Sequence, residues 1–293
     1  MLKKMLLNGG NGMTLVSNRG YLNEDYRLFH STDRRDVDFQ THSHDFHKLV
    51  LCLTGSVTYI VEGVTYDLAP WDILLIPEHQ IHRSILRSTE IYERIIIWIN
   101  DRFFDKYAEP ALREVFRWPL KRGSGLYCPP KPLRAQLTEK LYGVEHHQHA
   151  QEPGSRLLSD TYLIQFLLEL SSRFVSQPAE NEARAHSDPR FSALLAYINQ
   201  NLAGELSIAA LAGQFYLSPS HLMHAFKRHT GMTVHQYVQQ KRLISAAARI
   251  RAGESVTAAA MQAGFMDYTT FLKAFRKQYG CAPGELRKKI QNN

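Results

Sequence analysis

The last third of the chain contains an internal repeat, in which a ten-residue segment recurs 49 positions later. Residues Leu222–Gly231 (LMHAFKRHTG) align with residues Phe271–Gly280 (FLKAFRKQYG). Ser218 and Asp267 precede the two segments at the same offset. Both residue types favour a helix N-cap, because their side-chain oxygens accept a hydrogen bond from a free backbone N–H. Each copy therefore predicts a short helix, a tight turn and a capped second helix, which together make a helix-turn-helix.

Helical spacing assigns a buried and an exposed face to the second helix of each copy. Phe271, Ala274 and Phe275 recur at i, i+3 and i+4 and are expected to face the core. The exposed side chains in the N-terminal half of such a helix usually read base edges, whereas cations near its C-terminal end suit phosphates. The base-reading candidates are Ser220, Met223, His224, Tyr268, Thr269, Leu272 and Lys273. The phosphate-binding candidates are Lys227, Arg228, Arg276 and Lys277.

The segment between the two copies predicts one long helix over residues 233–252. A helix of that length spans about 28 Å at ~1.5 Å per residue, and one turn of DNA measures ~34 Å. The two second helices are therefore spaced to enter successive major grooves on one face of the duplex. The alternative interpretation is a plain helical bundle that happens to repeat.

Positive charge is concentrated in the same third of the chain. Residues from Pro189 onward carry 13 Lys and Arg against 4 Asp and Glu, a net charge of +9, whereas the net charge of the whole chain is +7. The first 188 residues carry 22 against 24, which gives −2. This asymmetry indicates a polyanionic partner, nucleic acid first. Because a solvated basic surface has the same composition, the repeat and not the charge selects double-stranded DNA.

The second copy also carries a longer motif: Gly-Phe, an aromatic-rich helix, Phe with two basic residues, Gly, and Pro three residues later. The matching residues are Gly264, Phe265, Phe275, Arg276, Lys277, Gly280 and Pro283. This pattern resembles the signature of the AraC/XylS family of bacterial transcription regulators, with Ala259 where isoleucine is usual and Leu286 where an aromatic residue is common. The resemblance implies a sequence-specific regulator, controlled by a sugar or small anionic metabolite that binds an N-terminal sensor domain.

The first half of the chain predicts a β-rich domain. Between residues 39 and 99, short β-branched or aromatic runs such as Leu49–Leu53 and Ile95–Ile99 are separated by glycines and prolines, which is typical of a β-sandwich or barrel. The family resemblance implies a cupin-like barrel here. The expected fold is multidomain β + α, with a cupin-like barrel over 1–125, a helical dimerisation segment over 126–176, a linker over 177–188 and an all-α domain of two helix-turn-helix units joined by a long helix over 189–293.

The expected dimerisation segment has one strongly helical part. Residues Ser155–Val175 predict a single helix with a wide apolar stripe from Leu157 to Leu170, whereas Pro129–Gly154 contains several helix breakers. Such a wide stripe suits a homodimer contact. The alternative is that the stripe packs on the chain's own barrel.

Three histidines fall within the eight residues Thr41–Lys48 (THSHDFHK). In the cupins that this half resembles, a first motif supplies H-x-H and a glutamate four residues later, and a second motif supplies another histidine. His42 and His44 fit the first motif and His82 fits the second, but Lys48 stands at the glutamate position. The effector-binding candidates are therefore His42, His44, Lys48 and His82.

Three interpretations of this histidine group remain open. Imidazoles suit zinc, iron, copper or nickel, but a cationic Lys48 would repel the ion, so we expect no metal and no cofactor. The favoured interpretation is a polar pocket for an anionic or polyhydroxyl ligand. The plainest is that these residues cap the mouth of the barrel.

The sequence contains no G-x-S-x-G, P-loop or H-E-x-x-H motif, so we expect no catalytic residues and no enzyme. The alternative is a cupin-type metal-dependent enzyme fused to a DNA-binding module. Three scattered cysteines and the lack of a signal or spanning segment indicate a cytoplasmic, nucleoid-associated protein. The expected partners are double-stranded DNA, a small-molecule effector and a second copy of the chain, with RNA polymerase as a candidate and no membrane.

Overall fold

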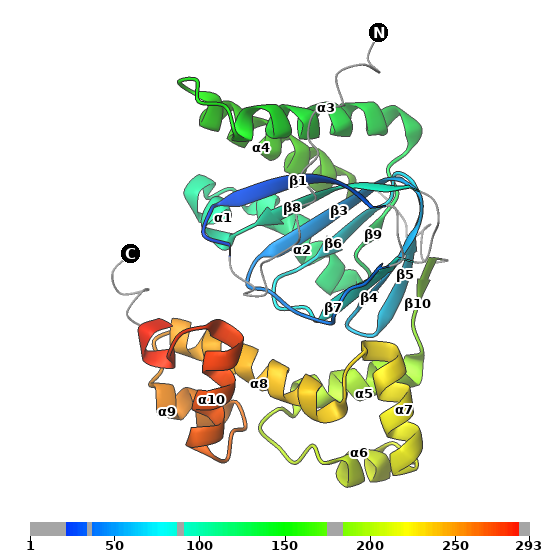
Figure 1. Ribbon diagram of the computed structural model, residues 1–293, viewed down its shortest axis with the longest axis vertical. Helices are drawn as coiled ribbons and strands as arrows, with labels where there is room; N and C mark the ends of the chain where they lie inside the picture. Colours follow the sequence, from blue (N-terminus) through cyan, green and yellow to red (C-terminus); the bar gives the residue numbers. More distant parts are fainter. Residues whose placement is uncertain (1–21, 34–36, 87–90, 175–183, 287–293) are drawn as a thin grey trace.

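The computed structural model describes residues 22–33, 37–86, 91–174 and 184–286, which form two domains (Figure 1). Two β-sheets with helices on one side make up the N-terminal domain, and helices alone make up the C-terminal domain. The predicted multidomain β + α fold is therefore confirmed.

Each sheet of the N-terminal domain contains five strands in antiparallel pairs. The first sheet has the order β1 (Tyr26–Asp33), β8 (Tyr92–Ile99), β3 (His47–Thr54), β6 (Ile73–Ile76), β9 (Leu126–Tyr127). The second has the order β10 (Ala185–His186), β5 (Val64–Leu68), β4 (Val57–Val61), β7 (His82–Leu86), β2 (Val37–Asp38). Among the described residues no ladder joins the two sheets. The N-terminal domain is thus an open sandwich of two sheets, and the expected closed cupin-like barrel is wrong in this respect.

The first sheet is buried on both faces, which explains the unbroken apolar runs in its strands. In β3, Leu49 and Leu51 pack into the core beneath the helices, whereas Val50 and Cys52 pack against the second sheet. Successive side chains of a strand point to opposite faces, so a strand that is covered on both sides needs apolar residues at every position.

Four helices cover the outer face of the first sheet (Figure 1). They are α1 (Asp101–Tyr107), α2 (Pro110–Arg122), α3 (Lys131–Gln148) and α4 (Ser155–Phe174). The inner side chains of α4 lie in the same apolar cluster as Leu49 and Ile97 of the sheet. The expected packing of this helix on its own domain is therefore present, and α4 keeps some of its leucines exposed as well.

Helix α3 is one continuous helix, although its sequence suggested several breaks. Pro132 lies in the first turn, where a missing N–H costs nothing because that group has no partner within the helix. Gly143 lies where α3 meets α4, and a Cβ there would approach the Tyr162 ring to 2.6 Å. Pro132 is therefore compatible with the start of α3, and Gly143 allows α3 to pack closely against α4.

The C-terminal domain contains two helix-turn-helix units that share a central helix. The helices are α5 (Pro189–Gln200), α6 (Ile208–Gln214), α7 (Pro219–Thr230), α8 (Val234–Arg251), α9 (Val256–Gln262) and α10 (Tyr268–Tyr279). Val234 and Tyr237 of α8 pack into the core of the first unit, and Ala247 and Ile250 pack into that of the second. No described helix of the protein is long and apolar enough to cross a membrane.

The two units correspond at two different offsets. Ser218 and Asp267 cap the second helices, as predicted, but the first helices begin after Ser207 and Ser255, which lie 48 positions apart. The turn of the second unit is therefore one residue longer. Its left-handed residue is Gly264, whereas the first unit places Tyr216 there, with a φ of 54° and a side chain 96% exposed.

The end of the expected linker takes part in the N-terminal domain. Residues 177–183 lie outside the described part of the chain, but Ala185 and His186 form β10 and pair with Tyr66 and Thr65 of β5. Arg184 also pairs with Asp72 at 2.6 Å. These residues anchor the chain to the second sheet immediately before α5.

Phe275 is fully buried in the core of the second helix-turn-helix unit. Replacing it in Phe275→Ala leaves a cavity, so we expect the free energy of unfolding of the C-terminal domain to fall by ~3–5 kcal/mol. Denaturation of the full chain, followed by circular dichroism, measures this. Met266→Ala, at an almost fully exposed position, is the control. A loss below about 1 kcal/mol for Phe275→Ala would contradict the assigned core.

Candidate DNA interface and histidine cluster

The exposed faces of α7 and α10 carry the candidate DNA-binding side chains. Six of the base-reading candidates are exposed, namely Ser220, Met223, His224, Tyr268, Thr269 and Lys273. Leu272 is half-buried and packs partly against the core of its unit. The phosphate-binding candidates Lys227, Arg228, Arg276 and Lys277 are all exposed. Their contact with DNA remains a prediction, for which the structure supplies accessible side chains.

The cations on these faces are not neutralised within the described part of the chain. No carboxylate there lies within salt-bridge distance of Lys227, Lys273 or Arg276, whereas Arg249 and Arg251 are paired. Unpaired cations suit phosphates, since they give up no existing ion pair on binding. Met223 and Tyr268 are 45% and 44% exposed beside them, and such apolar surface suits thymine methyl groups.

Helix α8 sets the separation of the two units, which lie at its two ends (Figure 1). Its 18 residues span about 27 Å at ~1.5 Å per residue. The helix begins at Thr233 with a capping box, in which Thr233 and Gln236 each bond the other's backbone N–H. The connector predicted from the sequence is thus one continuous helix with a defined start.

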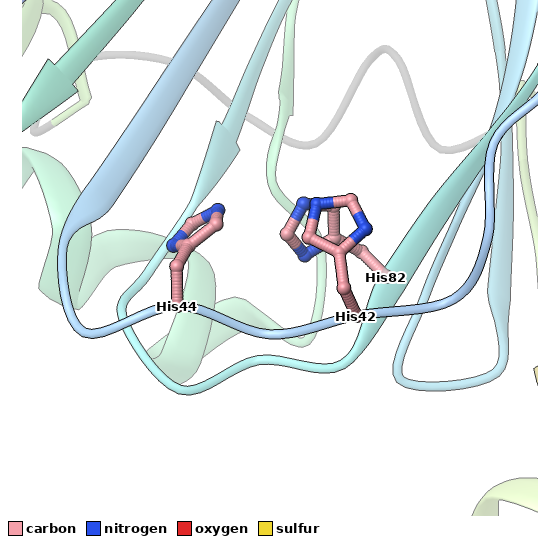
Figure 2. A group of neighbouring side chains, drawn as sticks. All are labelled: His42, His44 and His82. Atoms are coloured by element: carbon pink, nitrogen blue, oxygen red, sulfur yellow. The ribbon is translucent and has the colours of Figure 1, made fainter. Parts of the chain in front are cut away.

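The histidines come together because one loop pairs with strand β7. His42 and His82 form an antiparallel bridge, in which each backbone N–H donates to the other residue's carbonyl, at 3.0 and 2.9 Å. Opposed residues project on the same face, and so does the residue two positions along, which is His44 (Figure 2). The ring centroid of His82 lies 4.4 Å from that of His42 and 4.8 Å from that of His44. The structure therefore brings together three of the four effector-binding candidates as a histidine cluster.

Backbone carbonyls fix the tautomer of all three imidazoles. Each Nδ1 atom of His42, His44 and His82 lies 2.7 to 2.9 Å from a carbonyl oxygen two residues away. Because a carbonyl oxygen only accepts hydrogen bonds, Nδ1 carries the proton, and a neutral ring keeps its lone pair on Nε2. The Nε2 atoms of His44 and His82 are buried with no hydrogen-bond partner among the described residues. One ring nitrogen from each histidine lies within 4.8 Å of the others.

Lys48 is buried beside the cluster, and its surroundings favour the uncharged form of its amine. Burial, and after it the nearby Arg94, lowers the pKa of Lys48 to about 7. Its Nζ atom lies 5.5 Å from the centroid of the Tyr59 ring. Burial likewise holds the pKa of His44 and His82 well below the ordinary value, with Lys48 as the next cause. Both imidazoles are therefore neutral near pH 7.

A second group of titratable side chains, His47, Glu78 and Asp101, satisfies its own hydrogen bonds. The backbone N–H of Glu78 donates to His47 Nδ1 at 3.1 Å, so His47 Nε2 carries the proton and faces Asp101 at 3.4 Å. Arg113 binds the same carboxylate at 2.6 Å. This arrangement is a hydrogen-bonded network around the ion pair of Arg113 with Asp101, and its imidazole offers no free lone pair.

The loop that carries His42 and His44 also contacts the C-terminal domain, and no feature of the sequence indicated this contact. Side chains at odd-numbered positions of this loop reach α7 and α8, while those at even-numbered positions point into the N-terminal domain, as the alternation of an extended chain requires. The contacts are Thr41 with the Thr230 carbonyl, Ser43 with Gln240 and Asp45 with Arg251, at 3.1, 2.7 and 3.3 Å.

The turn between β4 and β5 makes a second contact between the domains. Glu62 accepts hydrogen bonds from the Tyr237 hydroxyl at 2.5 Å and from Lys241 Nζ at 2.6 Å. Burial, and after it Glu62, raises the pKa of Tyr237 well above its ordinary value, so Tyr237 stays protonated as a donor. Gly63 follows with a φ of 77°, and a Cβ there would lie 2.8 Å from Leu195. We call Glu62, Tyr237 and Lys241 the interdomain clasp.

These features define a class of protein, in which a β-sandwich sensor domain directly contacts a DNA-binding domain of two helix-turn-helix units. Comparison with protein families gives the same division. Residues 27–195 match the family described as an AraC-like ligand binding domain, and residues 211–289 match a helix-turn-helix domain. Because the first match covers more than half of the chain, the protein belongs to the AraC family of transcription regulators. The resemblance inferred from the C-terminal motif is confirmed.

Two individual comparisons extend over most of the chain. The HTH-type transcriptional activator RhaS of Escherichia coli (strain SMS-3-5 / SECEC) is 26% identical over 258 residues, which cover 86% of this chain and 88% of RhaS. Among solved structures, the unsaturated fatty acid-bound ToxT of Vibrio cholerae strain SCE256 is 14% identical. Its match covers 92% of this chain and 98% of ToxT, with a TM-score of 0.37.

The two kinds of DNA contact predict different mutational effects. Lys273→Ala and His224→Ala should weaken binding to a specific site more than to random DNA, because base contacts carry the sequence information. Lys227→Ala and Arg276→Ala should weaken both equally and flatten the salt dependence by roughly one unit each. Fluorescence anisotropy of the full chain at several salt concentrations measures both effects. Equal losses from all four variants would contradict the base-reading assignment.

Proposed function

We infer that this protein regulates transcription from specific promoters, and that a small-molecule effector bound at the histidine cluster controls the orientation of its DNA-binding domain. The observation that carries this proposal is the double use of the loop 41–46. The side chains of His42 and His44 enter the sensor domain, and those between and beside them contact α7 and α8. A ligand that moves the histidines must therefore move contacts to the DNA-binding helices.

The proposed mechanism is a shift between two arrangements of the domains. The effector stabilises whichever arrangement it binds more tightly, and the promoter affinity follows that population. The interdomain clasp stabilises the described arrangement, because Glu62 accepts one hydrogen bond from a neutral donor and one from a charged donor at a partly buried position. RhaS is named as an activator, so we propose activation here, with RNA polymerase as the partner at the promoter and the cytoplasmic nucleoid as the location.

We propose no catalytic role for the histidine cluster. The loop 41–46, which holds the cluster, also contacts the DNA-binding domain. RhaS, a relative of this protein, is named as a transcriptional activator. The alternative of a cupin-type enzyme fused to a DNA-binding module requires turnover of a substrate at this cluster. The sensor domain over 1–125, the helical segment over 126–176 and the DNA-binding domain over 189–293 would then remain as proposed.

Promoter binding by the full chain tests this function directly. Duplexes from upstream of the gene and of its neighbours are titrated by fluorescence anisotropy at physiological salt, with random duplex as competitor. We expect one segment to bind at least about a thousandfold more tightly than random DNA. Equal, weak binding to all duplexes would reject the regulator and leave only electrostatic attachment.

The clasp predicts a local change in dynamics. Glu62→Gln removes the charge that faces Lys241, so we expect hydrogen exchange of the loop 41–46 and of the β4–β5 turn to accelerate about tenfold. That corresponds to about 1.4 kcal/mol, near the lower end for a hydrogen bond to a charged group. Exchange mass spectrometry of the full chain measures it. Glu114→Gln, whose partners Lys121 and Arg117 lie on the same helix α2, is the control and should leave these segments unchanged.

Helix α4 supports a proposed homodimer. Leu157 and Leu168 lie three turns apart on one face of α4, and both are exposed, Leu157 to 64%. Light scattering of the full chain at tens of micromolar should give a mass near twice 33.6 kDa. Leu157→Lys with Leu168→Lys should give a monomer, and the control Leu120→Lys, at an exposed position of α2, should not. A monomeric wild type would exclude the dimer.

A further inference from the structure

The histidine cluster has the donor arrangement of a metal site, which differs from the pocket for an anionic or polyhydroxyl ligand that the sequence favoured. Its three imidazoles have Nδ1 committed to backbone carbonyls, which is how protein structures commonly hold histidines that ligate metals through Nε2. Two of the Nε2 atoms are buried with no hydrogen-bond partner among the described residues. Buried acceptors of this kind cost free energy unless something binds them.

We propose that His42, His44 and His82 bind a divalent transition-metal ion, and that this ion is the effector to which the DNA-binding domain responds. The inference rests on the proposed regulatory function, to which it adds the chemical class of the ligand. Three imidazoles suit zinc, iron, copper or nickel.

The sequence spoke against an ion because Lys48 stands at the glutamate position, but the structure places Lys48 Nζ 5.5 Å from the centroid of the Tyr59 ring. Burial and the nearby Arg94 also lower the pKa of Lys48, which weakens its repulsion of an ion.

The distances allow such an ion after a small adjustment. The ring nitrogens lie within 4.8 Å of one another, whereas three nitrogens at ~2.1 Å from a tetrahedral zinc ion lie about 3.4 Å apart. Each ring therefore has to move by about an ångström or less to reach these bond lengths. His42 is the exposed member and sits on the loop, so it has the most freedom to close on the ion.

That movement passes directly to the DNA-binding domain. The neighbours of His42 in the chain are Thr41 and Ser43, which bond the Thr230 carbonyl and Gln240. Arg83 follows His82 and donates to the carbonyl of Arg228 at 3.4 Å. Closing the three rings around an ion thus displaces contacts at the end of α7 and in the middle of α8 together.

The group of His47, Glu78 and Asp101 serves as an internal comparison. It also contains three possible ligand residues within 4.8 Å of one another, but the His47 Nδ1 lone pair already accepts a hydrogen bond from the Glu78 backbone N–H. The remaining nitrogen carries a proton that faces Asp101. We therefore expect no ion there, and His47 is the matched control for the cluster.

The test uses the full chain, purified without a histidine tag and stripped with a chelator. Zinc(II) ion alone is titrated in competition with a chromophoric chelator, and bound zinc is counted by elemental analysis. Wild type should bind one equivalent. His42→Ala, at the exposed position where folding is least at risk, and His82→Ala should each weaken zinc binding at least about a hundredfold, since even the loss of a supporting partner weakens a site ten- to a hundredfold. His47→Ala, and His149→Ala at the exposed C-cap of α3, should match wild type.

The same proteins are then titrated with the preferred promoter duplex, with and without zinc. We expect zinc to change the promoter affinity of wild type and of His47→Ala at least tenfold, and that of His42→Ala less than twofold. The metal site would be overturned if wild type bound no zinc, or if His42→Ala and His82→Ala bound zinc as tightly as wild type. Specific promoter binding in the same experiment would still support the regulator. Zinc bound by the three histidines without any change in promoter affinity would overturn the ion as effector. Loss of promoter specificity in the zinc-free and zinc-loaded chain alike would reject the regulator itself.

Discussion

The alternation of side chains along the loop 41–46 is the constraint on which the proposed mechanism depends. An extended segment cannot turn all its side chains to one side, so the even positions enter the sensor domain and the odd positions face outward. The C-terminal domain occupies that outward side through α7 and α8. A segment of six residues thereby serves two domains, and neither set of contacts can change without the other.

The two sheets of the N-terminal domain fix the position of the loop 41–46. The first sheet is covered on both faces, by α1 to α4 on one side and by the second sheet on the other. Its strands are consequently a rigid layer of closely packed apolar side chains. The bridge between His42 and His82 attaches the loop to the first residue of β7, and the clasp on the neighbouring β4–β5 turn attaches the same end of the domain to α8.

Most of the elements followed from local sequence, because their patterns are repeated within a few residues. The strands containing Leu49–Leu53 and Ile95–Ile99, the helix α4 and the capped helices α7 and α10 all lie where their periodicity placed them. Helix α3 was obscured because the roles of Pro132 and Gly143 depend on position and on a partner helix. The second helix-turn-helix unit has a turn one residue longer than the first. The sequence alignment did not reveal this difference, because it matched only the second helices of the two units.

The contacts between the domains could not be predicted from the sequence, since they join residues with no shared motif. Ser43 and Gln240 are 197 positions apart, and Glu62 and Lys241 are 179 apart. A lone glutamate before a glycine is typical of many turns, and only the folded chain places it against α8. The convergence of the histidines was different, because the resemblance to the two cupin motifs indicated it. The proposal of a metal ion instead of an organic ligand rests on the orientation of each ring, which the spacing of residues in the sequence does not contain.

On the proposal that α7 and α10 both bind DNA, the sharing of α8 between two cores fixes the spacing of the sites that the protein can bind. Each end of this helix is embedded in a different unit, so the separation and rotation of α7 and α10 are fixed by one rigid rod. The natural binding sites should therefore keep a constant distance between their two half-sites. Five additional base pairs, about half a helical turn, would carry the second half-site to the far side of the duplex, where α10 cannot follow.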